Sequence, residues 1–133
     1  MARHADVIAV YPEFETRFDL SYAIKKGNLL FLAGLVSADD DFKLVGAGDM
    51  EAQIRCIYRR LQFVLGKANA SLKDVVSETN YTTNSPELTK YASVRAEIYK
   101  SAGAAMPVAT GVHVTGLTLP GAMLEVHATA VLD

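Results

Sequence analysis

The chain has 133 residues, of which 50% are hydrophobic and 21% charged, and its formal net charge is -2. This length is typical of one domain with a single core, so we expect residues 1–133 to form one domain. The balanced charge, without a basic stripe, argues against binding to nucleic acid. The single cysteine, Cys56, excludes a disulfide scaffold and fits a reducing, cytoplasmic location.

The N-terminal segment does not have the pattern of a signal peptide. Met1 to Val10 carries Arg3, His4 and Asp6 and no long apolar run. The longest apolar runs elsewhere, such as residues 29–33, are far too short to span a membrane. We therefore expect a protein without a membrane partner.

Two strands joined by a tight turn are the first elements that the sequence predicts. Residues 21–26 form a short strand, and Gly27-Asn28 favours a hairpin turn. Residues 29–33, Leu-Leu-Phe-Leu-Ala, predict a fully buried strand. The polar, glycine-containing stretch over residues 39–48 predicts a loop.

An amphipathic helix over residues 50–68 comes next. Asp49 can cap it, because its carboxylate can accept hydrogen bonds from the free N–H groups of the first turn. Apolar side chains recur at three- and four-residue spacing along this segment, and charged side chains lie away from them. A turn at residues 71–74 leads to a strand over residues 75–83, which are rich in β-branched side chains.

The second predicted helix begins at Ser85-Pro86, with serine as the cap and proline at the first helical position. Its apolar stripe consists of Leu88, Tyr91, Ile98 and Ala102. Arg95 lies inside this stripe, where a guanidinium needs a carboxylate or a wet cleft. It is a candidate for binding an anionic substrate. The alternatives are an inter-subunit salt bridge or a side chain that reaches out to solvent.

Residues 108–114 and 122–132 predict the last two strands. In the final strand the even-numbered side chains are apolar, and we expect this face to pack under the helices. The odd-numbered face carries Glu125 and His127. A carboxylate on a covered sheet face suits general acid–base chemistry, and an imidazole can carry a proton. The alternatives are a solvated glutamate and a structural histidine at an interface.

We expect neither a metal nor a cofactor. The three histidines, His4, His113 and His127, lack the spacing of metal ligands. The chain has no P-loop and no dinucleotide-binding fingerprint.

The element order β-β-α-β-α-β-β predicts an α+β domain with one mixed sheet and two helices on one face. The other sheet face would be open in a monomer, although it carries Met123 and Val131. A partner subunit is the natural cover for that face.

Five stretches resemble the RidA/YjgF family, also called endoribonuclease L-PSP, over nearly the whole chain from about Leu20 to Leu132. They are Ala23–Gly34, Gln53–Leu65, Ala70–Val76, Tyr81–Thr83 and Leu119–Val131. The resemblance implies a chorismate-mutase-like (Rid) fold and a homotrimer with clefts between its subunits. It also implies hydrolysis of reactive enamines or imines, such as 2-aminoacrylate, to a keto acid and ammonia.

The resemblance also assigns site residues. In the family an arginine in a Pro-x-Arg-Ser/Thr stretch grips the substrate carboxylate, a glutamate on the last strand activates water, and a tyrosine and an asparagine complete the cleft. The glutamate matches Glu125, the Ser/Thr position Thr110, the arginine Ala109, the tyrosine Leu20 (with Tyr22 close by) and the asparagine Arg95. Alanine cannot form the bidentate pair of an arginine, so we do not expect 2-aminoacrylate to be the substrate of this divergent chain.

Three functions remain open. The first is an enamine or imine deaminase in which Glu125 orients water and Arg95 or His127 assists. The second is a non-catalytic trimer that binds a small metabolite such as a keto acid, which the alanine at 109 favours. The third is a ribonuclease, against which the net charge of -2 and the missing basic groove argue.

Overall fold

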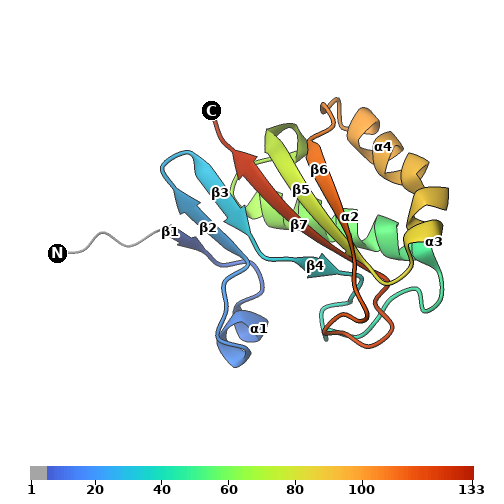
Figure 1. The fold of residues 1–133 in the computed structure, drawn as a ribbon. Coiled ribbons are helices and arrows are strands. Elements are labelled where there is room, and N and C mark those ends of the chain that lie inside the picture. Colours follow the sequence, from blue (N-terminus) through green and yellow to red (C-terminus); the bar gives the residue numbers. More distant parts are fainter. Residues whose placement is uncertain (1–5) are drawn as a thin grey trace.

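The computed structural model describes residues 6–133 (Figure 1). The N-terminal residues 1–5, which include His4 and half of the segment compared above with a signal peptide, lie outside the described part. The strands are β1 (Asp6–Ile8), β2 (Ala23–Lys26), β3 (Leu29–Leu32), β4 (Leu35–Val36), β5 (Val75–Thr82), β6 (Val108–His113) and β7 (Leu124–Val131). The helices are α1 (Pro12–Arg17), α2 (Met50–Lys67), α3 (Ser85–Lys90) and α4 (Ala92–Ser101), with a short 3-10 helix η1 (Leu72–Asp74) before β5.

The seven strands within residues 6–133 form one sheet in the order β1-β2-β3-β7-β5-β6, with β4 pairing to β7 as well. The pair β5–β6 is parallel and the other pairs are antiparallel, so the sheet is mixed. Helices α2 and α4 contact each other, and α2 also packs against β7 (Figure 1). The predicted α+β class, with one mixed sheet and helices on one face, is confirmed.

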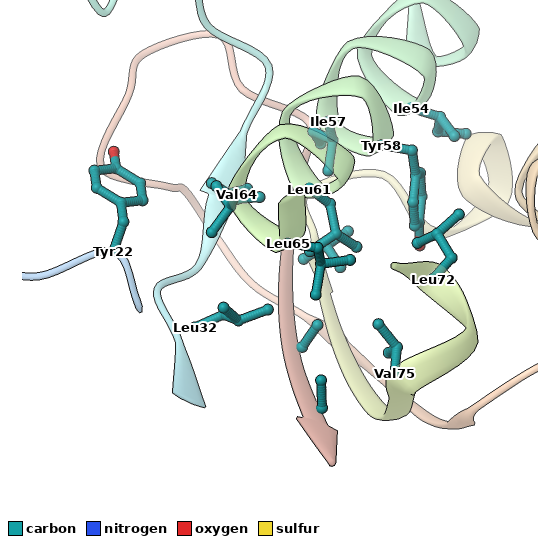
Figure 2. Packing of buried hydrophobic residues seen from close by; sticks show 14 of the residues in the cluster. Tyr22, Leu32, Ile54, Ile57, Tyr58, Leu61, Val64, Leu65, Leu72 and Val75 are labelled. Carbon is teal, nitrogen blue, oxygen red and sulfur yellow. The ribbon is translucent and has the colours of Figure 1, made fainter. Parts of the chain in front are cut away.

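The packing of α2 follows its sequence pattern. Asp49 caps the helix as predicted, since its side chain accepts a hydrogen bond of 3.0 Å from the backbone N–H of Ala52. Figure 2 shows the side chains of Ile57, Leu61 and Leu65 projecting from α2 toward the sheet. On β7 the even-numbered residues from Leu124 to Ala130 are buried beneath the helices, also as predicted. None of the helices in the described part of the chain has the length and apolar character of a membrane span.

The prediction of a fully buried strand over residues 29–33 is wrong. Strand β3 alternates, with Leu30 and Leu32 buried but Leu29 39% and Phe31 48% exposed. The physical reason is that helices cover only one face of the sheet. Every second side chain of β3 therefore points to the open face, and an unbroken apolar run cannot reveal that by itself.

The second predicted helix is broken into α3 and α4. Tyr91 separates them with φ -105° and ψ 18°, which is not a helical conformation. The cap of α3 is Asn84 rather than Ser85, because the Asn84 side chain accepts a hydrogen bond from the N–H of Glu87 at 3.2 Å. Ser85 Oγ instead lies 3.0 Å from His113 Nδ1 on β6.

Elements β1, α1 and β4 were not predicted, because each has six residues or fewer and is too short for a periodic pattern to repeat several times. The carboxylate of Glu15 on α1 holds this region together. It accepts hydrogen bonds from the backbone N–H groups of Val10 and Tyr11, both at 3.1 Å, and of Tyr22 at 2.9 Å. The Glu15 carboxylate thereby ties α1 to the start of β2.

Candidate functional site

Strand register divides the polar side chains of the sheet between its two faces. Residues that pair across neighbouring strands lie on the same face. Glu125 pairs with Tyr81 and lies on the open face, together with His127. Glu78 pairs with Ala128 on β7, whose side chain is buried beneath the helices. These polar side chains of the described sheet therefore fall into two separate clusters, one on each face.

The open-face cluster lies in a hollow of about 410 Å³. Glu125 and His127 line it from β7, and Tyr81 lines it from β5. Ala33 and Gly34, between β3 and β4, form another part of its wall. The backbone approaches the carboxylate so closely at Gly34 that an added Cβ would overlap Glu125 Oε2.

Glu125 has the electrostatic character of an acid–base group. Burial raises the pKa of its carboxyl, and the neighbouring His127 offsets only part of this effect. Among residues 6–133, no hydrogen-bond donor contributes to lowering that pKa. The carboxyl is therefore partly desolvated and can exchange a proton closer to neutral pH than an ordinary glutamate can.

This raised pKa predicts how stability depends on pH. The folded state holds the Glu125 proton more tightly than the unfolded chain, whose glutamates titrate near pH ~4.3. The contribution of Glu125 to the free energy of unfolding is therefore lost as the pH rises from the unfolded-state pKa through the folded-state pKa. We expect Glu125→Gln to match the parent protein below pH ~4 and to be the more stable protein at neutral pH. Urea unfolding at both pH values measures this, and equal stability at neutral pH would contradict it.

The helix-side cluster is built around the carboxylate of Glu78, a residue that is only 1% exposed. Its Oε1 accepts hydrogen bonds from Tyr58 Oη on α2 and from Arg95 Nε on α4, both at 2.8 Å. Its Oε2 accepts a hydrogen bond from Tyr99 Oη. Arg95 Nε also lies 3.1 Å from Tyr58 Oη. One buried carboxylate thus joins β5 to both main helices.

The charges of this cluster compensate each other. Burial raises the pKa of Tyr58 and of Tyr99, and the charge of Glu78 raises both further, so both phenols stay protonated donors. Burial alone would lower the pKa of Arg95, but Glu78 and Tyr58 outweigh burial and raise it. The Arg95 guanidinium therefore stays charged and paired.

The structure brings together only some of the site residues that the sequence predicted. Glu125 and His127 share the hollow, and Thr110 pairs with Thr79, which in turn pairs with His127, so Thr110 lies on the same open face. Ala109 pairs with Glu78 and lies on the helix-covered face. Arg95 is bound to Glu78 there, so within one chain it does not meet Glu125.

The two candidate residues near the first hairpin, Leu20 and Tyr22, lie in different environments. Leu20 is exposed, whereas Tyr22 is buried in the core between α1 and α2. The Tyr22 ring meets Tyr11 edge-on at 5.0 Å, and the Arg60 guanidinium lies 6.0 Å from it. Burial raises the pKa of Tyr22, although Arg60 lowers it in part. In this chain Tyr22 is therefore a core residue.

Sequence reasoning missed Glu78, the centre of the helix-side cluster. A signal was present, because glutamate is depleted in strands and Glu78 stands in the middle of a β-branched segment. The same argument had singled out Glu125. Tyr58 and Tyr99 gave no signal, since tyrosines in a helical apolar stripe are ordinary core residues. Among residues 6–133, no group of three or more His, Cys, Asp or Glu side chains could hold a metal ion.

The fold and the titratable carboxylate in a hollow on the open sheet face define a small α+β domain with a ligand-sized site. Residues 12–132 match the family model described as Endoribonuclease L-PSP. The chain therefore belongs to the endoribonuclease L-PSP family, which is the RidA/YjgF family it resembles in sequence.

Known relatives support this family. The chain is 32% identical to the RutC family protein PH0854 of Pyrococcus horikoshii, over 83% of this chain and 84% of that protein. It is 28% identical to the 3-aminoacrylate deaminase RutC of Acinetobacter baylyi, over 81% of this chain and 82% of that one. The Rid-family protein YyfA of Yersinia pestis superposes with a TM-score of 0.83 at 24% identity, covering 97% of this chain and all of YyfA, which confirms the Rid fold.

Proposed function

We propose that this protein is a hydrolase that deaminates a small, reactive enamine or imine, with Glu125 as the acid–base group. The observation that carries the proposal is the partly desolvated Glu125 carboxyl beside His127 in a hollow of about 410 Å³. A relative named as a 3-aminoacrylate deaminase supports it. The single, buried cysteine fits the cytoplasmic location that we propose with this function.

The reaction needs one group that can both give and take a proton. Protonation of the enamine at carbon produces an iminium ion, and water then adds to the iminium carbon as it loses a proton. Proton transfer to the amine releases ammonia and leaves a carbonyl group, so one water is consumed for each ammonia released. A carboxyl with a raised pKa, such as that of Glu125, can donate the proton to the enamine carbon and then accept the proton from the attacking water.

The substrate that we propose differs from 2-aminoacrylate. Ala109 stands where the family's arginine binds the substrate carboxylate, and Arg95 is committed to Glu78. Among the described residues that line the hollow, Leu117 is apolar and none is a lysine or an arginine. We therefore propose an enamine or imine that is less dependent on a carboxylate anchor.

We also propose that the site is completed in a homotrimer. The open face and its edge expose Leu29 and Phe31 on β3 and, most of all, Val108 on the edge strand β6, which is 73% exposed. Burying such side chains between subunits is favourable. Analytical ultracentrifugation is expected to give the mass of three chains, and a monomer would contradict this part of the proposal.

A direct assay tests the activity. The purified protein is mixed with enamines that a second enzyme releases in the cuvette, some with a carboxylate and some without, and ammonia release is compared with buffer. We expect acceleration, with no advantage for the carboxylate-bearing substrates. Tight binding of keto acids without acceleration of ammonia release would overturn the proposed enzymatic activity. It would favour the second candidate function, a trimer that binds a metabolite without catalysis, which the missing arginine also favours.

Substituting Gly34 tests the geometry of the hollow. The added methyl group of Gly34→Ala would overlap Glu125 Oε2 and force the carboxyl to move. Because a displacement of about 1 Å can cost ~100-fold in rate, we expect kcat to fall by one to two orders of magnitude. Gly66→Ala is the matched control, since its added Cβ meets no neighbour within 4 Å. Equal rates for the two variants would contradict the prediction.

A further inference from the structure

A second cavity lies on the helix-covered face of the sheet, opposite Glu125. Its volume is about 240 Å³. Ile54, Tyr58 and Leu124 form its buried floor, and Tyr91 lines it at the break between α3 and α4. Exposed Ala92, the first residue of α4, stands at its rim. The helix break that the sequence did not predict therefore lies at an opening into the domain.

Two residues that line the cavity each carry a buried polar atom without a partner in the described part of the chain. Arg95 Nη2 and Asn80 Oδ1 are both buried, and neither has a hydrogen-bond partner among residues 6–133. Leaving a buried donor or acceptor unpaired costs about 1–3 kcal/mol. Such atoms are rare in folded proteins, and each calls for an explanation. Because both belong to residues that line the same cavity, a ligand that supplies the missing bonds is one such explanation.

The neighbouring strand leaves room beside these atoms. Gly111 on the edge strand β6 pairs with Asn80, and a Cβ added at Gly111 would meet nothing within 4 Å. The terminal torsion of an asparagine side chain is broad, so the Asn80 amide can turn toward a ligand at little cost.

The charge balance determines which ligand fits. Arg95 already forms an ion pair with Glu78 at 2.8 Å, so its free Nη2 needs an acceptor but no further negative charge. A second carboxylate would leave net negative charge in a largely apolar cavity, which is unfavourable. A neutral amide edge offers both a carbonyl for Arg95 and an N–H for Asn80. The apolar walls favour a ring or short hydrocarbon as the rest of the molecule.

We propose that this cavity between β5, α2 and the α3–α4 break binds a small neutral molecule with an apolar body and an amide-like edge, held by Arg95 and Asn80. At about 240 Å³ the cavity is smaller than the ~300–1,000 Å³ of sites for drug-sized ligands, so the ligand is about the size of one substituted ring.

Three probes of one shape test the proposal by titration calorimetry and by amide-resonance shifts in solution. Benzamide has the ring and the neutral edge, benzoate replaces the edge with a charge, and toluene lacks it. We expect benzamide to bind and to shift resonances of α3, α4 and β5. Benzoate and toluene are each expected to bind at least about tenfold more weakly than benzamide, because each loses at least one hydrogen bond. Benzoate binding as tightly as benzamide would overturn the proposal.

Two variants assign the binding to this cavity. Asn80→Leu removes the acceptor, and Ala92→Trp narrows the opening from an exposed position that leaves the core intact. Each is expected to weaken benzamide binding about tenfold or more. Glu125→Gln, on the opposite face, is expected to leave it unchanged. Undiminished binding in a folded Ala92→Trp protein, or no benzamide binding by the parent protein up to the solubility limit, would overturn the proposal.

Discussion

Glu78→Ala is expected to lower the free energy of unfolding by about 3–5 kcal/mol, the usual cost of breaking a buried ion pair. The variant would leave the guanidinium of Arg95 and the hydroxyls of Tyr58 and Tyr99 without their shared acceptor. It would also remove the side-chain hydrogen bonds by which Glu78 joins β5 to α2 and α4. Urea unfolding measured by circular dichroism gives this value directly, provided that the slope with denaturant stays the same.

Two further variants separate this explanation from a general loss of charge. Glu51 forms an exposed pair with Arg55 on α2, and we expect Glu51→Ala to cost no more than about 0.5 kcal/mol. The double variant Glu78→Leu with Arg95→Met removes both charges, so it should be more stable than Glu78→Ala. A loss below about 1 kcal/mol in Glu78→Ala would contradict the central role of this carboxylate.

Glu125→Gln is expected to lower kcat of the proposed deaminase by about 10²–10⁴-fold, the usual contribution of a general acid–base group. Glutamine is nearly isosteric with glutamate but can neither give nor take the proton at the substrate carbon or at water. The initial rate of ammonia release measures the effect. Because the same substitution should stabilise the folded protein at neutral pH, loss of activity cannot be explained by unfolding.

A control and the kinetic pattern complete this test. Glu97 is an exposed glutamate on α4, and Glu97→Gln is expected to keep the parent rate. A rise in KM with unchanged kcat in Glu125→Gln would mean that Glu125 only binds substrate, which contradicts an acid–base role. His127→Gln should move the pH profile of kcat, because His127 is the charge that offsets the raised pKa of Glu125.

The elements predicted correctly from sequence are those whose signal repeats within the element. Helix α2 has 18 residues, enough for its apolar stripe to recur several times, and its cap at Asp49 is a local contact. Strand β7 has eight residues, so its alternation is clear. Helix α1 has six residues and is held by Glu15 through backbone groups of Val10 and Tyr22, and such contacts leave no periodic trace.

The residues of the candidate site likewise include some that the sequence could place together and some that only the structure could place. The two-residue spacing of Glu125 and His127 places them on one face of any strand, so the amino-acid sequence determined by itself that they lie together. Only the tertiary structure decided that Gly34 closes on Glu125 and that Arg95 binds Glu78 on the opposite face. The physical reason is that these contacts join different elements. Strand order, register and helix packing determine them, and no local pattern encodes those.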